Sequence, residues 1–189
     1  LNDKEIVAQA KVLADPRFKV TQADLQTNFA MLREITKLNS TLAEAAKVLV
    51  DSKKNVELIK SVAKRSLEKV MENKEEHPAT KLVKSADELL KEITELDKSL
   101  RSQPKTKGIV DDSYRVSNHI GIAGWYIGSA YGKPSPTAEI YLTLAKKKLK
   151  EGVDKINLFI NNDMNKFNQD FSNSGLLLLT AVEPVKLTD

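Results

Sequence analysis

Residues 21–70 read TQADLQTNFAMLREITKLNSTLAEAAKVLVDSKKNVELIKSVAKRSLEKV. Apolar side chains recur throughout this stretch at steps of three and four, which is the period of an amphipathic helix. Thr21 and Asp24 form a capping-box pattern at its start, with a hydroxyl at the N-cap and an acid three residues later. The stretch predicts one long helix or two nearly collinear ones. We expect a kink or break near 51–55, where the polar Ser52 takes a core position.

Three further segments have helical patterns. The segment 80–100 carries a strict a/d seam, and we expect a third helix over 112–131, capped by Asp111-Asp112-Ser113. Ser135 and Pro136 have the N-cap and N1 positions of a fourth helix, which extends to about Phe171. These four stripes and their short links predict an all-α fold, an antiparallel up-down four-helix bundle with long first and last helices.

The two ends of the chain differ from this pattern. Residues 1–15 alternate apolar and polar side chains, which favours a strand or extended segment, although a short helix is the alternative. Pro16 ends either element. We therefore divide the chain into a strand-like segment at 1–15, a helical bundle at 16–175 and an extended tail at 176–189 that packs on the bundle. Gly132 is expected to end the third helix in a left-handed conformation.

Composition excludes several classes of function. The chain has 189 residues, of which 41% are hydrophobic and 30% charged, which suits a single domain with solvated helix faces. Its net charge is only +4 and lysines alternate with acids, so we do not expect nucleic acid as a partner. There is no cysteine, which excludes disulfides, zinc-thiolate sites and thiol nucleophiles. No apolar run reaches the ~18–20 residues that span a bilayer, so no transmembrane segment is expected.

The chemistry-bearing residues do not form a catalytic pattern. The two histidines, His77 and His119, have no partner at metal-ligand spacing along a helix, and we interpret His77 as an exposed turn residue. No serine lies in a nucleophile elbow, and paired carboxylates occur at helix ends, where they complement the helix dipole. We therefore expect no metal, no cofactor and no catalytic residue in this chain, and predict that it is not an enzyme.

One stretch remains unusual. Residues 119–132 read HIGIAGWYIGSAYG and contain four of the seven glycines and the only tryptophan. Gly121, Gly124 and Gly128 share one side of the expected helix, and small residues at this spacing allow a second helix to approach closely. We predict that these glycines form a packing seam with another helix of the bundle and that Trp125 projects elsewhere.

The aromatic residues around this stretch form a possible interaction patch. Its predicted members are Tyr114, His119, Trp125, Tyr126 and Tyr131. Two interpretations stay open at this point: these side chains pack at the edge of the core, or they form a surface for a ligand or partner.

Several short motifs resemble one known family. Asp15-Pro16-Arg17 precedes the Thr-capped TQADLQTNFAMLREI, Pro136-Thr137 opens the last helix, and DMNKFNQDF lies near its end. Together these resemble the C-terminal helical region of bacterial sortilin-like β-propeller proteins, often labelled BNR-repeat glycosyl-hydrolase-like. The resemblance implies that residues 1–14 are the last strand of a preceding Ig-like domain. It also implies that the parent is exported to the periplasm or cell envelope. The glycine-dense third helix departs from the Leu-rich pattern expected there.

The expected function follows from these features together. In that family the active or binding surface belongs to the propeller, so the resemblance carries no catalytic residue to this chain. We expect a non-catalytic structural or interaction module at the C-terminus of a larger exported β-propeller protein. Its partner would be the propeller or Ig-like part, or another protein. The alternative is a carbohydrate- or peptide-binding module that uses the glycine and aromatic face of the third helix.

Overall fold

The structure is a computed structural model that describes residues 7–13, 15–69, 75, 77–102 and 111–177. The described residues are all-α, as the sequence predicts, but the strand favoured for residues 1–15 is not seen in the described part of that segment. The helices are α1 (Gln22–Glu68), α2 (Pro78–Leu100), α3 (Val116–Gly128), α4 (Pro136–Phe159), the π-helical segment η1 (Ile160–Met164) and α5 (Asn165–Asn173).

The helix α1 begins at the predicted capping box and is unbroken. The Thr21 hydroxyl accepts a hydrogen bond from the Asp24 amide at 3.1 Å, and the Thr21 amide donates to the Asp24 carboxylate at 3.2 Å. The predicted kink or break near 51–55 is wrong. Ser52 is buried within the continuous helix, while the side chains of 53–55 are exposed. A serine is small enough to occupy a core position without interrupting the helix.

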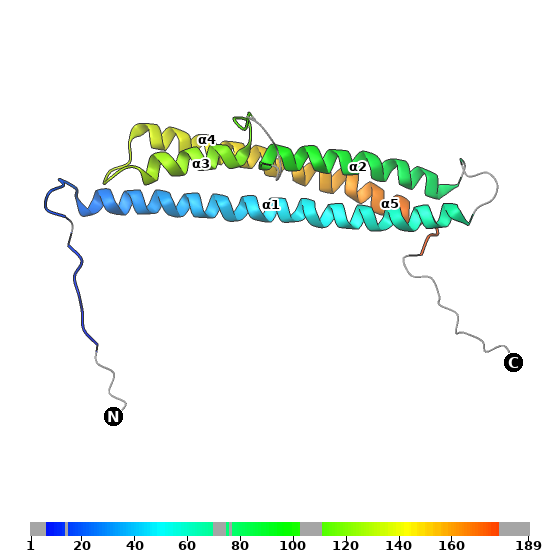
Figure 1. Ribbon diagram of the computed structural model, residues 1–189, viewed down its shortest axis with the longest axis horizontal. Coiled ribbons are helices and arrows are strands. Elements are labelled where there is room, and N and C mark those ends of the chain that lie inside the picture. The colour runs from blue at the N-terminus through cyan, green and yellow to red at the C-terminus, as the bar shows by residue number, and fades with distance from the viewer. Residues whose placement is uncertain (1–6, 14, 70–74, 76, 103–110, 178–189) are drawn as a thin grey trace, which may run out of the picture.

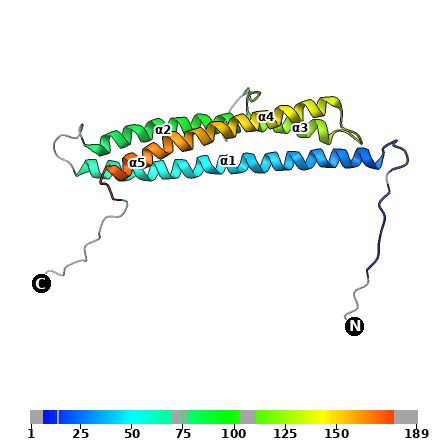
Figure 2. The same ribbon diagram turned by 180° about the vertical axis from the view of Figure 1, so that it is seen from behind.

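The helices lie in three side-by-side columns, because α2 and α3 follow one another in the same column; the predicted up-down four-helix bundle would have one column for each helix. At 47 residues, α1 is about 70 Å long and spans the bundle. The chain then returns along it through α2 and α3, which lie end to end, and runs forward again through α4, η1 and α5 (Figures 1 and 2). Contacts between α1 and α2 and between α3 and α4 are extensive, whereas α2 and α3 scarcely touch. A helix as long as α1 can be covered by two shorter helices in succession, so four helices need only three columns.

One apolar core runs along these columns. Its fully buried large side chains include Leu49, Leu100, Ile120 and Phe159, each contributing about 1.5–3 kcal/mol by burial. A smaller cluster of Ile127, Ala138 and Leu142 closes the end where α3 meets α4.

The last helix contains a π-helical turn that the sequence pattern did not predict. Phe159 and Met164 are both buried although they are five residues apart. A π-turn adds one residue to the helical repeat, so this step of five keeps both side chains in the core. The apolar Ile160 lies four residues after Ile156 and four residues before Met164. Because these steps fit an ordinary α-helix, the sequence pattern gave no sign of the π-turn.

The start of α3 differs from the prediction. Asp111-Asp112-Ser113 does not cap the helix but forms a turn, in which the Asp111 carboxylate accepts from the Ser113 amide at 2.9 Å. Arg115 takes the N-cap position without a side-chain cap. It is only 4% exposed, and its guanidinium donates to the Arg101 carbonyl oxygen at 3.2 Å. Because the Arg115 side chain is anchored inside the protein, the turn before it is fixed and the helix begins only at Val116.

The two terminal segments are only partly described. Residues 7–13 form neither helix nor strand, and the side chain of Val12 is 96% exposed. The predicted tail can be examined only at its beginning, where Leu176 packs against the core and Leu177 is exposed. Residues 178–189, most of the predicted tail, lie outside the described residues, as does 103–110.

Candidate functional site

The helix α3 is held between α1 and α4, with one side facing solvent. Its buried residues follow a helical repeat: Val116, Ile120, Ala123 and Ile127. The Asn28 side-chain amide of α1 donates to the carbonyl oxygens of Ile127 at 3.0 Å and Ala130 at 3.3 Å. The Ile127 carbonyl oxygen also accepts from the Ala130 amide at 3.3 Å, so the Asn28 amide is an additional donor there. The C-terminal end of α3 is therefore fixed to α1, and its outer face has a defined position.

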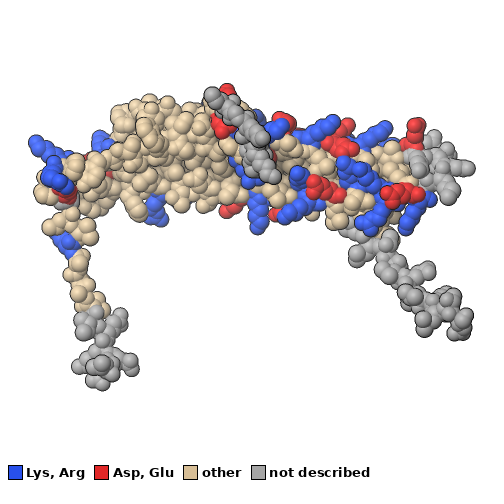
Figure 3. All heavy atoms as spheres, in the orientation of Figure 1, with Lys and Arg blue, Asp and Glu red and all other residues tan. Residues whose placement is uncertain are grey.

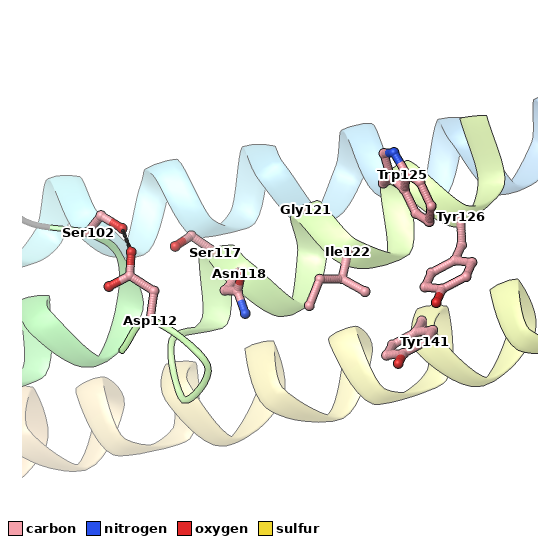
Figure 4. A pocket seen from close by; sticks show the side chains of 9 residues that line it. All are labelled: Ser102, Asp112, Ser117, Asn118, Gly121, Ile122, Trp125, Tyr126 and Tyr141. Carbon is pink, nitrogen blue, oxygen red and sulfur yellow. Dashed lines mark hydrogen bonds between the residues drawn. The ribbon is translucent and has the colours of Figure 1, made fainter. Parts of the chain in front are cut away.

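A groove runs along the outer face of α3 towards α4 (Figure 4). It is open to solvent and has a volume of about 610 Å³. Its lining residues are Ser102, Asp112, Ser117, Asn118, Gly121, Ile122, Trp125, Tyr126 and Tyr141. One end of the groove is aromatic and the other is polar.

The aromatic end consists of three rings in contact. Trp125 meets Tyr126 edge-on, with ring centroids 4.9 Å apart, and Tyr126 stacks on Tyr141 of α4 at 4.7 Å with an interplanar angle of 9°. Aromatic pairs in these geometries contribute about 0.5–1.5 kcal/mol beyond the area that they bury. Tyr126 and Tyr141 thereby hold α3 against α4, while Trp125 remains 66% exposed.

The polar end is organised around Asp112. The Ser102 hydroxyl donates to Asp112 Oδ2 at 2.7 Å, and Arg115 Nε lies 2.9 Å from Asp112 Oδ1. The second contact is an ion pair without the alignment of a hydrogen bond. Asp112 is the one carboxylate among the lining residues, and it already has two partners. General acid-base hydrolysis of a glycoside needs two carboxyl groups across a cleft, and the described lining residues of this groove include one.

The predicted glycine seam is correct at one position and wrong at two. A Cβ built on Gly124 would lie 3.5 Å from Ile35 of α1, an ordinary packing distance. At Gly121 and Gly128 it would meet no atom of the described chain within 4 Å. Both face solvent, at four and three residues from Trp125, so Trp125 shares their side of the helix instead of projecting elsewhere.

The close approach between helices occurs at Gly152 instead. A Cβ there would lie 3.1 Å from Leu100 and 3.3 Å from Val116, at the junction where α2 ends and α3 begins. The sequence contains the signal for this contact: Gly152 follows Leu149 by three residues and precedes Ile156 by four, on the buried stripe of α4.

The predicted aromatic patch is not one surface. Trp125 and Tyr126 line the groove, together with Tyr141, which sequence reasoning missed. Tyr131 packs instead against Phe18, with ring centroids 4.4 Å apart, and Tyr114 lies beside the Arg115 guanidinium at 5.4 Å. One sequence signal could have identified Tyr141. It is an aromatic residue next to Leu142, which lies on the predicted core stripe of the fourth helix, so it is expected at the edge of that core.

Both histidines are half-buried in the structure. His119 is half-buried on α3, and burial lowers its pKa below the ordinary 6.5; the charge of Lys148 acts in the same direction and that of Glu151 opposes it. His77 is half-buried rather than exposed, because its Nδ1 accepts from the Ala79 amide at 3.2 Å and caps α2. Within the described ranges, no three His, Asp or Glu side chains gather where a metal ion could bind.

Charge is distributed unevenly over the surface. Residues 116–132 contain no Lys, Arg, Asp or Glu, although 30% of the chain is charged. Figure 3 shows that the surface over α3 and the start of α4 is almost free of charged side chains, whereas α2 and the second half of α1 carry many. In the described part of the chain, no helix has the length and apolar content needed to cross a bilayer.

Comparison with known proteins adds no relative. No family model, no curated protein and no solved structure matches the chain. The groove and the surface of α3 are therefore the features of the described chain that bear on its function.

Proposed function

We propose that this chain is a non-catalytic interaction module that binds another protein through the outer face of α3. The observation that carries the proposal is Trp125, two-thirds exposed on an uncharged helix and seated at the aromatic end of a groove. Centres of protein interfaces are enriched in tryptophan and tyrosine and depleted in charge. Trp125 packs edge-on against Tyr126, and Tyr126 in turn stacks on Tyr141 of α4, which supports a surface that is fixed before a partner binds.

The resemblance noted from the sequence supports a wider proposal. The chain would then be the C-terminal part of a larger exported β-propeller protein, and residues 1–14 would belong to its preceding domain. Its support is the Asp15-Pro16-Arg17 motif, which lies a few residues ahead of α1 and in which the Arg17 amide donates to the Asp15 carboxylate at 2.9 Å. Under this proposal the outer face of α3 remains available to a separate protein.

Photocrosslinking in cells that make the protein tests the main proposal. A benzophenone amino acid replaces Trp125 in one variant and Leu158, an exposed residue near the far end of α4, in a matched control. We expect a crosslinked protein product from position 125 and little from position 158. Equal yields at both positions, or no product at position 125, would contradict the proposal.

A carbohydrate- or peptide-binding module is the second candidate. The specific observation in its favour is the pairing of an exposed Trp125 ring with the polar Ser117 and Asn118 in one groove. Titration with cello-, malto- and chito-oligosaccharides, followed by the fluorescence of Trp125, separates the candidates. A saturable change that Asn118→Ala weakens would favour carbohydrate, and an unchanged spectrum would favour the protein partner.

A further inference from the structure

The segment 15–20, shortly before α1, lies at the end of the bundle where α3 is connected to α4 (Figure 1). It begins with a turn, in which the Asp15 carboxylate accepts from the Arg17 amide at 2.9 Å and pairs with the Arg17 guanidinium at 2.6 Å. The Phe18 amide then donates to the Asp15 carbonyl oxygen at 3.1 Å. These bonds give residues 15–20 a defined shape, and we call this segment the strap.

Two side chains of the strap contact the connection between α3 and α4. Phe18 packs against Tyr131, with ring centroids 4.4 Å apart. Val20 covers Gly132, which is buried, and a Cβ at Gly132 would lie 3.0 Å from the Val20 side chain. Gly132 therefore meets two requirements at once, a positive φ of 111° and room for Val20. The glycine at this position suits a connection that the strap covers.

These contacts lie at the end of α3 that carries the aromatic residues of the groove. Tyr131 follows Tyr126 by only five residues. Between them, the Ala130 carbonyl oxygen accepts from the Asn28 side chain of α1 at 3.3 Å. The strap and Asn28 therefore hold the same short stretch, and a change at the strap reaches the groove through it.

The strap has few buried contacts of its own. Phe18 is 49% exposed, and residues 16–19 are all exposed. Residues 7–13 before it are exposed as well and form neither helix nor strand. A segment with few buried contacts opens locally at a much lower free-energy cost than the whole fold. The strap can therefore lift while the bundle stays folded.

We infer that the strap regulates the outer face of α3. When it is docked, it holds Tyr131 and the end of α3, and with them the contact between Trp125 and Tyr126. When it lifts, Gly132 is uncovered and the end of α3 loses one of its supports. Docking of the strap and occupation of the face order the same stretch, so each favours the other. This inference rests on the proposed function, since it names the regulation of the same face.

Hydrogen exchange of the full chain tests whether the strap holds α3. Phe18→Ala removes the ring that packs on Tyr131 and should quicken exchange at residues 128–130 about fivefold or more. Exchange in α2 should not change, because the bundle stays folded. Phe29→Ala removes another exposed phenylalanine, from α1, and is the matched control. Unchanged exchange at 128–130 in Phe18→Ala, or equal effects of the two variants, would overturn the inference.

Val20→Ala tests the second contact of the strap. It leaves Gly132 with less cover and should quicken exchange at the same residues, with an unchanged far-UV circular dichroism spectrum. Exchange as slow as in the wild type would show that Val20 does not hold the connection, which would also overturn the inference.

Crosslinking from position 125 in cells tests whether this hold regulates the face. Phe18→Ala should lower the yield of crosslinked product about fivefold or more, whereas Phe29→Ala should leave it unchanged. Faster exchange with an unchanged yield would overturn the regulation and leave the interaction function standing. No product from position 125 in the chain without these substitutions would contradict the proposed function, and the regulatory inference with it.

Discussion

Three glycines show how much a single position depends on its neighbours. Gly152 is packed between Leu100 and Val116, Gly132 has a φ of 111° beside Val20, and Gly121 faces open space. Adding one methyl group therefore has a different consequence at each position.

The contrast between Gly121 and Gly152 is directly measurable. Gly121→Ala should raise the free energy of unfolding by about 0.8–1 kcal/mol, because alanine favours helix and its Cβ meets nothing in the described chain. Gly152→Ala gains the same propensity, but it forces Leu100 and Val116 to move, and overpacking of this kind costs about 1–3 kcal/mol. Urea unfolding of dilute protein should place Gly152→Ala at least about 1 kcal/mol below Gly121→Ala. Equal stabilities would show that the α2–α3 junction is looser than described.

Gly132 tests backbone strain before α4. Gly132→Ala places a side chain at positive φ and brings its Cβ to 3.0 Å from Val20, so we expect a loss of about 1–2 kcal/mol or more. Gly175→Ala is the matched control, because Gly175 has a φ of 70° but open space around its Cβ position. Thermal unfolding should show the larger loss for Gly132→Ala, and the reverse order would contradict the packing of Val20.

Protonation of His119 links stability to pH. Burial lowers its pKa from 6.5, so the unfolded chain binds a proton more readily than the folded protein does. The stability that this group contributes is present above pH 6.5 and is lost as the pH falls through the lowered pKa. In urea unfolding at a series of pH values, His119→Gln should reduce the decline below pH 6.5 relative to the wild type. An identical decline in both proteins would mean that His119 does not contribute.

At the scale of elements, the positions of the helices depend on contacts between distant parts of the sequence. Asn28 near the start of α1 holds the end of α3, and Tyr141 of α4 stacks on Tyr126 of α3. These contacts give α3, only 13 residues long, a fixed position although its N-cap has no side-chain hydrogen bond.

Removing the amide of Asn28 tests this anchoring. Asn28→Ala leaves the carbonyl oxygens of Ile127 and Ala130 without this donor, and we expect a loss of about 1–2 kcal/mol. Asn39→Ala, at an exposed position of the same helix, is the control and should change stability little. Hydrogen exchange should also quicken at the C-terminal end of α3 in Asn28→Ala alone. Equal effects of the two substitutions would contradict the anchoring.

The π-turn predicts which deletion the last helix tolerates. Because η1 contains one residue more than an α-helical repeat, deletion of Asn162 can convert it to α-helix and keep Phe159 and Met164 in the core. Deletion of Asp154 within α4 instead rotates every buried residue on one side of it. Circular dichroism melting should show the smaller loss for the Asn162 deletion. A larger loss there would exclude an inserted residue as the origin of η1.

Across the whole molecule, the sequence predicted helices better than it predicted their arrangement. Local signals were sufficient for the capping box at Thr21 and for Ser135 and Pro136 at the start of α4, because a cap involves neighbours in sequence. The three-column arrangement depends on which helices meet along α1, and hydrophobic period carries no information about that. For the same reason the pattern identified Trp125 and Tyr126, but not Tyr141 across the groove.

The distribution of charge gives the molecule two different regions. The α2 region is covered by ion pairs such as Lys60 with Asp87, whereas the α3 region has an uncharged face. Surface ion pairs contribute about 0–1 kcal/mol each, so they favour solubility more than stability. The charged region is therefore suited to contact with solvent, and the face of α3 is the proposed site of partner contact.

Fluorescence of Trp125, the only tryptophan, measures whether the outer face of α3 is free in the isolated chain. In dilute protein we expect emission typical of an indole in water and strong quenching by acrylamide, because Trp125 is 66% exposed. When a partner occupies the face, the emission should shift to shorter wavelength and the quenching should fall. Blue-shifted emission that resists acrylamide in the dilute chain would contradict the proposed interaction face, because the chain itself would then cover Trp125.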